Sequence, residues 1–456
     1  MMKPQTAMTI GGSDSSAGAG IQADLKAFSA LGIHGVTVLT SITVQNTQTV
    51  KKIIPTSPED IKNQIDAVME DIPITQVKTG LLYQPDIAKI VSSATKKYNW
   101  DLIVDPVLTA TSGDSLASMN LTEEIKKTLI PISTIITPNI PEAESITHTS
   151  ISTIEEMKQA AKTIHQIGTK NVIIKGGHLQ SKEAYDLLYD GKKYTEINLP
   201  RIPHRKAHGS GCTFSALLTG YLAKGHTVQS AFSQAKYALW NMINQGYNIG
   251  KGSDVLTITN QTIMHSPQPM PTKNHMDTWI HLSKTIPNIL NDLPLSFTPE
   301  VGCNIGFALA NAKNRKDVCA IDGRIIRSFC KPQRCGPFRF GVSKHIASII
   351  LATMQTYPDH RCAMNIKYTP ENLSLIKKTN YAISSFNRKN EPKNISSTMD
   401  WGTKTAINKT ESCPDFIYDT GGMGKESMIR ILGQNPSDVY RKLKQINSIA
   451  KKQMKN

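Results

Sequence analysis

The chain has 456 residues, enough for two or three domains that each bury their own core. Its 39% hydrophobic content is ordinary, and no apolar run approaches the length of a membrane-spanning helix, which argues against a membrane protein. The formal net charge of +16 is spread along the chain without interleaved aromatic residues, so it disfavours nucleic acid as a partner and suits phosphorylated small molecules.

The seven cysteines are odd in number and lack paired spacing, which indicates reduced thiols and predicts a cytoplasmic protein. Cys330 and Cys335 are the nearest pair, but no CxxC partners accompany them, so structural zinc is not expected. The opening "MMKPQTAMTIGG" has no basic-then-apolar layout of the kind that marks a signal peptide.

The first predicted unit is a strand, a glycine-rich loop and a helix, within "AMTIGGSDSSAGAGIQADLKAFSALG" (residues 7–32). We expect Ile21, Leu25 and Phe28 to form the buried stripe of the helix and Asp24 to lie off it, in the first turn. The loop can be a phosphate cradle, or a plain turn whose carboxylate faces the helix dipole. Its spacing matches neither the Walker A motif nor the dinucleotide fingerprint.

Further polar residues follow apolar runs along the chain. In "VLTSITVQNTQTV" (38–50), the amides of Gln45 and Asn46 could bind a heteroaromatic ring. Residues 101–108, 133–144 and 171–178 read as buried strands that alternate with helical patterns, which predicts a mainly parallel sheet covered on both faces. Ligands bind at the carboxyl ends of such strands. There Glu142 could hold a magnesium–water shell, and Lys175 could neutralise a phosphate.

The stretch "KAHGSGCTFSALLTGYLAKG" (206–225) places small residues and a cysteine before a helix with apolar residues at helical spacing. The first turn of a helix has unpaired N–H groups and a positive dipole. It is therefore either an anion site with a poised thiol at Cys212 or a tight turn capped by Ser210.

Taken in order, these motifs resemble the hydroxymethylpyrimidine/phosphomethylpyrimidine kinases of thiamine biosynthesis, which have a ribokinase-like fold. The resemblance covers residues 5–260 and rests on "GGSDSSAGAGIQADLKAFSALG", "VQNTQTV", "DPVLTATSGDSL", "TPNIPEAE", "KGGH" and "HGSGCTFSA". It implies two successive phosphorylations of the pyrimidine, with ATP as co-substrate and Mg2+ as cofactor.

The same resemblance implies roles for individual residues. Gly12, Asp24 and Gln45 would bind the pyrimidine, while Asn139 and Lys175 would lie beside the nucleotide phosphates and Glu142 beside the metal. Gly209, Ser210 and Gly211 would form the anion hole for the transferred phosphoryl group. Cys212 would stand where sugar kinases of this fold carry a catalytic aspartate. A thiolate there would have a lowered pKa and could accept the proton of the substrate hydroxyl.

Three prolines and little periodicity mark residues 261–277 as a linker between a first domain, 1–260, and a second α/β domain, 278–456. The second domain carries arginines, among them Arg324, shortly before a helix that opens near His345. "DFIYDTGGMGKESMIRILG" (415–433) reads as strand, loop and helix. The loop residues Gly421, Gly422, Gly424 and Lys425 would form a second phosphate site.

This second region resembles the archaeal-type thiamine-phosphate synthase domain over residues 280–453. The resemblance rests on "PEVGCNIGFALANAKNRKDVCAIDGRI", "GPFRFGVSKHIASIIL", "AMNIKY", "MDWG" and "YDTGGMGKESMIRILG". It implies a three-layer α/β/α fold, a requirement for Arg324 and His345, and the joining of pyrimidine pyrophosphate to thiazole phosphate with release of pyrophosphate. The alternative is a non-catalytic module that senses thiamine phosphates. We expect small-molecule substrates, no nucleic-acid or membrane partner, and a homo-oligomer.

Overall fold

The structure is a computed structural model that describes residues 5–108, 120–202, 207–268, 270, 272–392, 397–422 and 424–453. Residues 109–116 of the motif "DPVLTATSGDSL" lie outside the described residues. The chain divides into two compact units, Met1–Pro269 and Met270–Asn456.

The segment predicted to be a linker, residues 261–277, is partly helical. It contains most of α9 (Asn260–Met264) and the beginning of α10 (Lys273–Asp292). The helix α9 forms because the Thr259 and Thr262 side chains each accept a hydrogen bond from the other residue's backbone N–H, a reciprocal cap. The prolines of the segment therefore do not prevent local helix formation on either side of them.

The first unit is built on a nine-stranded sheet with the order β3-β2-β1-β4-β5-β6-β7-β8-β9. The strands from β2 to β7 pair in parallel, while β3, β8 and β9 pair antiparallel. The strands are β1 (Thr6–Asp14), β2 (His34–Gln45), β3 (Val50–Pro55), β4 (Gln76–Thr79), β5 (Asp101–Val104), β6 (Ile135–Ile136), β7 (Val172–Gly176), β8 (Glu183–Tyr189) and β9 (Tyr194–Pro200).

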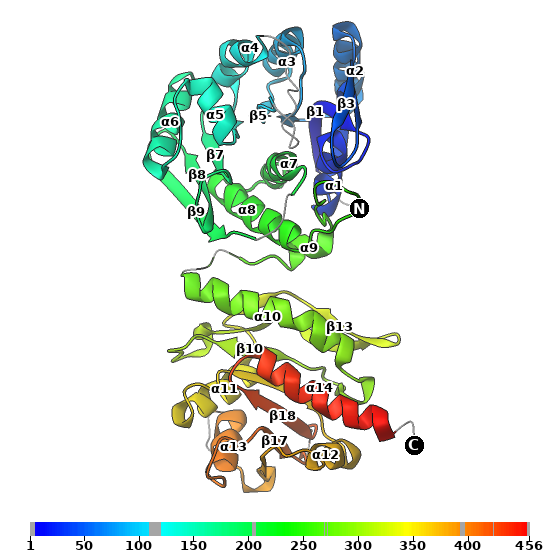
Figure 1. Cartoon of the computed structure of the whole chain (residues 1–456), viewed down its shortest axis with the longest axis vertical. Helices are drawn as coiled ribbons and strands as arrows, with labels where there is room; N and C mark the ends of the chain where they lie inside the picture. Colours follow the sequence, from blue (N-terminus) through cyan, green and yellow to red (C-terminus); the bar gives the residue numbers. More distant parts are fainter. Residues whose placement is uncertain are drawn as a thin grey trace. The chain divides into compact units, whose positions relative to one another are not determined.

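The predicted mainly parallel sheet with helices on both faces is confirmed (Figure 1). Strand residues alternate between two cores: Leu102 and Val104 pack in one, and Ile103 packs in the other. Helices α2 to α6 contribute to the first core, and α1, α7 and α8 to the second. The helices are α1 (Gly20–Ala30), α2 (Pro58–Asp71), α3 (Pro85–Tyr98), α4 (Leu121–Thr128), η1 (Ile130–Ile132), α5 (Ile140–Thr147), α6 (Ile154–Gln166), α7 (Ser210–Ala223) and α8 (Val228–Asn244).

The buried face of α1 differs from the predicted stripe. Phe28 is buried as expected, but Ile21 and Leu25 are only partly buried, whereas Asp24 is fully buried. The prediction that Asp24 lies off the buried face is therefore wrong. Small residues such as Ala27 let the helix approach the sheet closely, and the charge of Asp24 is matched by a buried lysine from a neighbouring strand.

The second unit contains a mixed seven-stranded sheet with the order β14-β11-β10-β15-β18-β17-β16 and a separate ribbon of β12 and β13. Only β16 and β17 pair in parallel; the other described pairs are antiparallel. The strands are β10 (Ile305–Ala308), β11 (Val318–Ile321), β12 (Arg324–Ser328), β13 (Lys331–Cys335), β14 (Phe338–Phe340), β15 (Cys362–Lys367), β16 (Ile383–Ser385), β17 (Phe416–Asp419) and β18 (Met428–Gly433).

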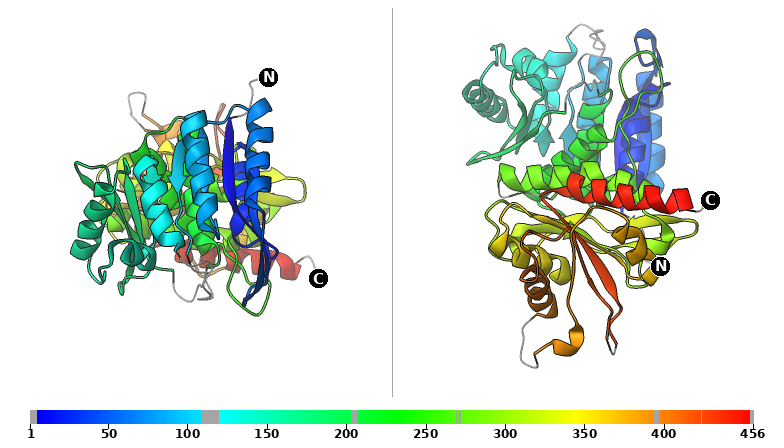
Figure 2. Two further views of the ribbon diagram at one scale, coloured as in Figure 1. Left: turned by 90° about the horizontal axis from the view of Figure 1, so that it is seen from above. Right: turned by 60° about the horizontal axis from the view of Figure 1, so that its bottom comes forward.

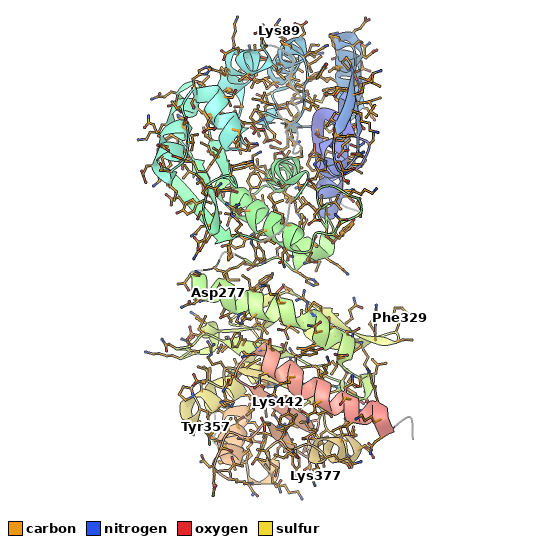
Figure 3. The ribbon with its side chains drawn as sticks, viewed as in Figure 1. Lys89, Asp277, Phe329, Tyr357, Lys377 and Lys442 are labelled. Carbon is orange, nitrogen blue, oxygen red and sulfur yellow. The ribbon has the colours of Figure 1, made fainter. Side chains whose placement is uncertain are left out.

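Helices cover both faces of this sheet, which gives three layers. One core holds Ala363, Ile417 and Leu432 against α11 and α13. On the other face α14 contacts both α10 and α12, and α14 (red) lies across the sheet in the right view of Figure 2. The helices are η2 (Leu295–Phe297), η3 (Arg315–Asp317), α11 (Lys344–Thr356), α12 (Pro370–Lys377), η4 (Arg388–Asn390), α13 (Thr398–Ile407) and α14 (Pro436–Gln453). The ribbon of β12 and β13 projects from the unit, with Phe329 fully exposed at its turn (Figure 3).

The prediction of a helix after the glycine loop at 421–425 is wrong, because β18 follows the loop. β18 is almost entirely buried and pairs with both β15 and β17 at the centre of the sheet. Its aliphatic residues favour a buried strand, and this tertiary pairing decides the conformation.

Candidate functional site

A cavity of about 640 Å³ opens in the first unit at the carboxyl ends of its parallel strands. Residues of the strands β1, β2, β4 and β7 and of the loops after β5 and β6 line it. Each site residue predicted for this half of the chain lines this one cavity: Gly12, Asp24, Gln45, Asn139, Glu142, Lys175, Gly209, Ser210, Gly211 and Cys212. Parallel strands bring their carboxyl ends to one edge of a sheet, so residues distant in sequence meet there.

Asp24 forms a buried ion pair on one wall of the cavity. Its Oδ2 accepts hydrogen bonds from Lys78 Nζ at 2.8 Å and from Thr9 Oγ1 at 2.7 Å. Asp24 raises the pKa of Lys78 against the opposing effect of burial, so the lysine stays charged. The other oxygen, Oδ1, is buried and has no hydrogen-bond partner among the described residues. A buried acceptor left in this way is available to a ligand that carries an N–H group.

Gln45 lies at the end of β2 in a chain of polar contacts. Its Nε2 is 3.0 Å from His208 Nε2, which in turn is 3.0 Å from Asp14 Oδ2. Burial alone would raise the pKa of Asp14, but hydrogen bonds from His208, from Ser16 and from the Ala19 amide lower it to about 2. Asp14 is thus a permanent anion that anchors the loop before α1.

The N-terminus of α7 faces the cavity without a side-chain cap. Gly209 is the N-cap residue, and among the described residues no side chain accepts a hydrogen bond from the first turn. The possibility of a turn capped by Ser210 is therefore excluded. Gly209 has a φ of +76°, and a Cβ there would lie 1.9 Å from the Gly18 carbonyl oxygen. A Cβ at Gly211 would lie 3.2 Å from Lys175 Nζ, so this ammonium stands beside the uncapped amides. The arrangement can bind an anion.

Cys212 lines the cavity in the first turn of α7, but its thiol differs from the prediction. Burial raises the pKa of Cys212 to about 11, although Lys78 acts in the opposite direction. The expectation of a lowered pKa is wrong for the protein without ligands. The helix dipole and one lysine do not compensate for the loss of solvent around the sulfur, so the group is a thiol at neutral pH.

Lys175, Asp105 and Glu142 form a second charged cluster at the ends of β5 to β7. Lys175 Nζ donates to Asp105 Oδ1 at 2.8 Å, and Ser215 of α7 donates to Asp105 Oδ2 at 2.9 Å. Asn139 and Glu142 cap α5 reciprocally, with bonds of 2.8 and 2.9 Å between each side chain and the other residue's backbone. Burial raises the pKa of Glu142 to about 7, with Lys175 opposing the shift.

No group of three or more His, Cys, Asp or Glu side chains in the described part of the chain could hold a metal ion by itself. Magnesium, however, usually keeps several waters and binds through one or two carboxylates and the phosphates of a substrate. Glu142, buried beside Lys175 and the uncapped amides of α7, fits that kind of site.

Sequence reasoning missed Lys78, Asp105 and the pair of Lys236 and Asp186, which are 2.8 Å apart and also line the cavity. Lys78 lies in a short strand and belongs to no recognisable motif. For Lys78 the only available signal was a charged residue inside an apolar run, "QVKTG", whereas Asp105 opens the motif "DPVLTATSGDSL" and was given no role. Such residues are buried only when they are paired, and the partner is not visible in one sequence.

In the second unit the structure brings Arg324 and His345 near each other. Arg324 opens β12 and donates to the Gly323 carbonyl at 2.7 Å, while His345 stands in the first turn of α11. Partial loss of solvent around the imidazole lowers the pKa of His345, and Arg324, Lys344, Arg388 and Arg430 lower it further. The imidazole is therefore neutral at pH 7 and surrounded by positive charge.

The glycine loop of this unit is bonded mainly to itself. The N–H groups of Gly422 and Lys425 each donate to the other residue's carbonyl, and the Gly421 N–H donates to Asp419 Oδ1. These three amides are therefore not available to a phosphate. Lys425 Nζ pairs with Glu391 at 3.2 Å. Gly424 has a φ of +68°, the left-handed region that favours glycine.

Comparisons with known proteins agree with the division into two units. Residues 14–257 match the phosphomethylpyrimidine kinase family, and residues 282–445 match the family described as thiamine-phosphate synthase ThiN. The bifunctional thiamine biosynthesis protein ThiDN of Methanocaldococcus jannaschii is 34% identical over 97% of this chain and 98% of its own length. The hydroxymethylpyrimidine/phosphomethylpyrimidine kinase of Bacillus subtilis is 42% identical over 54% of this chain and 92% of its own length.

A solved structure supports the fold of the first unit. The pyridoxal kinase of Staphylococcus aureus in complex with ADP is 31% identical and superposes with a TM-score of 0.55, covering 59% of this chain and 98% of that one. This likeness confirms the ribokinase-like fold. Among the described helices, none is long and apolar enough to cross a membrane.

The match to a synthase family, together with the full-length bifunctional relative, favours synthesis over sensing for the second unit. The first unit is an ATP-dependent kinase of hydroxymethylpyrimidine and its phosphate, and the second is a thiamine-phosphate synthase. The chain belongs to the family of bifunctional thiamine biosynthesis proteins that fuse a hydroxymethylpyrimidine/phosphomethylpyrimidine kinase to a ThiN thiamine-phosphate synthase.

Proposed function

We propose that the cavity of the first unit binds the aminopyrimidine between Gly12, Asp24 and Gln45. In this proposal Asp24 accepts a hydrogen bond from the exocyclic amino group of the pyrimidine. The unpartnered, buried Oδ1 of Asp24 carries this proposal, because an unsatisfied acceptor in a cavity costs about 1–3 kcal/mol until a ligand donates to it. The Gln45 amide, held at the end of β2 by contacts with Thr43 and His208, is placed to bond a ring nitrogen.

Two analogues of the pyrimidine test this assignment on the whole protein. Replacing the exocyclic amino group with hydrogen should weaken binding at least tenfold, since Asp24 Oδ1 then stays unpaired. Removing the 2-methyl group instead should lower the affinity only about fourfold, because burying one methylene-sized group contributes about 0.8 kcal/mol. Calorimetric titration measures both. Equal affinity for the parent compound and the analogue without the amino group would contradict the role of Asp24.

The transferred phosphoryl group of ATP is proposed to lie at the N-terminus of α7. The uncapped amides there, from Gly209 to Cys212, and the nearby ammonium of Lys175 offer fixed positive charge where negative charge develops. Asn139, which opens α5 beside Lys175, would border the nucleotide phosphates. Glu142 would hold Mg2+ through water, and the bound ion would lower the pKa of this carboxyl from about 7.

Cys212 is proposed as the acceptor of the hydroxyl proton. Since burial raises the pKa of its thiol to about 11, the thiolate is the minor form at neutral pH, and the rate should follow its population. Lys78, whose positive charge opposes that shift, would stabilise the thiolate when it forms.

In the second unit, Arg324 and His345 are proposed to act on the departing pyrophosphate. The C–O bond between the pyrimidine methylene and pyrophosphate breaks, the thiazole nitrogen forms the new C–N bond, and pyrophosphate leaves with the electron pair. Arg324 would hold the phosphate oxygens, and the neutral imidazole of His345 would donate a hydrogen bond to them.

We further propose a homo-oligomer that works in the cytoplasm. Ile42, Val44 and Ile54 are exposed side chains on the paired strands β2 and β3 at one edge of the first sheet, an apolar surface suited to a second copy. The seven cysteines are all free, which is typical of a reducing compartment. Ile54→Lys should reduce the mass measured by light scattering to that of a monomer; an unchanged mass would argue against this surface.

A further inference from the structure

Two guanidinium groups share one carboxylate in the core of the second unit. Asp419, at the end of β17, is fully buried and accepts from Arg388 Nε at 2.6 Å and Nη2 at 3.2 Å. Arg430 of β18 reaches the same carboxylate, with its Nη2 at 2.6 Å from Asp419 Oδ2. Two buried cations with one anion leave an uncompensated positive charge, which is costly in a poorly solvated place unless an anion joins it.

The two arginines differ in their exposure. Arg430 is enclosed: its side chain is 2% exposed, and it also packs over Phe386 and against the sulfur of Met399. Arg388 is 10% exposed and comes from the short helix η4 at the surface. Arg388 is therefore the arginine of the pair that a ligand from solvent would contact, while Arg430 adds buried positive charge.

Further positive charge surrounds this pair. Arg324, Lys344, Arg388 and Arg430 are all close enough to the His345 imidazole to lower its pKa. With Asp419 subtracted, the formal excess is three positive charges. A phosphate monoester carries about −1.5 to −2 at pH 7, and a pyrophosphate ester carries more. The cluster therefore suits a pyrophosphate better than a single phosphate.

The glycine loop is tied to the same carboxylate. The Gly421 N–H donates to Asp419 Oδ1 at 2.9 Å, so the loop and Arg388 have a common anchor. A Cβ at Gly422 would lie 3.9 Å from Cβ and Cδ of Arg388, which places the loop directly beside the arginine stem. Since three of the loop amides are bonded within the protein, the binding groups at this place are side chains rather than backbone N–H groups.

Resting on the assignment of Arg324 and His345 to the synthase site, we propose that Arg388, oriented by Asp419, binds the pyrophosphate group of the pyrimidine substrate. Bidentate pairing with Asp419 through Nε and Nη2 fixes the plane of the guanidinium and leaves Nη1 directed away from the carboxylate. In this proposal Arg388 has no role in binding thiazole phosphate, the other anionic substrate.

The test uses the full chain supplied with purified pyrimidine pyrophosphate and thiazole phosphate, without ATP. Arg388→Gln should raise the KM for the pyrimidine pyrophosphate at least tenfold and weaken binding of inorganic pyrophosphate, measured by calorimetry, by a similar factor. The KM for thiazole phosphate should change less than twofold. Arg388→Lys keeps the positive charge but loses the planar set of N–H groups of the guanidinium. Its affinity for pyrophosphate should therefore lie between those of wild type and Arg388→Gln.

Lys389→Gln is the matched control, because it removes one positive charge from the neighbouring exposed residue. It should leave both KM values unchanged. The melting transition of the second unit reports whether Arg388→Gln leaves that unit folded, and the pyrimidine kinase activity of the same chain serves as the internal reference for the first unit. If Arg388→Gln unfolds the second unit, the KM of Arg388→Lys for pyrimidine pyrophosphate and its affinity for inorganic pyrophosphate decide whether Arg388 binds the pyrophosphate group.

An unchanged KM for pyrimidine pyrophosphate in both Arg388 variants, an equal rise for both substrates, or a rise for thiazole phosphate alone would overturn the proposal. Arg324→Ala and His345→Ala tested in parallel separate the two assignments. If they keep full turnover while Arg388→Gln loses pyrophosphate affinity, the roles of Arg324 and His345 fail and that of Arg388 stands.

Discussion

The raised pKa of Cys212 leads to a sharp prediction about the kinase. With a pKa of about 11, only about three in ten thousand molecules hold the thiolate at pH 7.5. If the thiolate accepts the hydroxyl proton, kcat/KM should rise about tenfold per pH unit between pH 8 and 10, since this parameter reports groups of the free enzyme. Cys212→Asp replaces the thiol by a carboxyl group, whose ordinary pKa lies about five units below that of a thiol, so its profile should be flat over the same range.

Cys212→Ala should lower turnover on the order of a hundredfold, the usual contribution of a general base, and should weaken ATP binding little because the amides of α7 remain. Phosphorylated pyrimidine is followed by a discontinuous assay from pH 7 to 10, with ATP affinity measured separately. Near-normal turnover in Cys212→Ala would show that the anion hole alone carries the step. A flat wild-type profile would refute the thiolate as base.

Three further predictions follow from the described contacts. Gln45→Ala should raise the KM for the pyrimidine while the KM for ATP stays almost constant; equal effects on both would mean a structural role. The pKa of Asp14 is lowered from 3.8 to about 2, so its contribution to the free energy of unfolding is present above pH 4 and is lost as the pH falls towards 2. Asp14→Asn should lower the free energy of unfolding by about 2 kcal/mol at pH 7. Denaturant titrations of this variant should no longer show that part of the acid dependence. His345→Ala should abolish most thiamine phosphate formation from supplied pyrimidine pyrophosphate and leave kinase turnover unchanged, which a coupled assay and a kinase assay on one preparation can compare.

The parallel architecture of the first unit was predictable because its signals are local. Short apolar runs such as "DLIV" and "NVII" are long enough to form buried strands, and polar residues follow them at the carboxyl ends of those strands. Ten predicted residues meet in one cavity for this reason. The parallel pairing of neighbouring strands converts positions that are far apart in sequence into neighbours.

The two structural errors have one physical origin, which is tertiary pairing. Asp24 was expected off the buried face, yet the ammonium of Lys78, brought by the adjacent strand β4, makes its burial possible. The segment after Gly424 was expected to be a helix, yet pairing with β15 and β17 makes it a strand. Neither partner is visible in the local pattern.

Electrostatic properties were the least accessible from sequence. A thiol at a helix N-terminus is ordinarily expected to be acidic, but the pKa of Cys212 is set by how completely the surrounding protein excludes water. In the same way, the sharing of Asp419 by Arg388 and Arg430 depends on side chains that lie 42 positions apart in the chain and meet only in the folded second unit.

The most direct test of the account uses the intact protein with hydroxymethylpyrimidine, ATP, magnesium and thiazole phosphate. Thiamine phosphate should form with wild type. It should form on the order of a hundredfold more slowly with Cys212→Ala alone, should mostly be lost with His345→Ala alone, and should form readily again when the two variants are mixed. Supplied pyrimidine pyrophosphate should restore the reaction for Cys212→Ala only. Restoration of His345→Ala by pyrimidine pyrophosphate, or formation of no thiamine phosphate by wild type under any of these conditions, would contradict the division of the two reactions between these two sites.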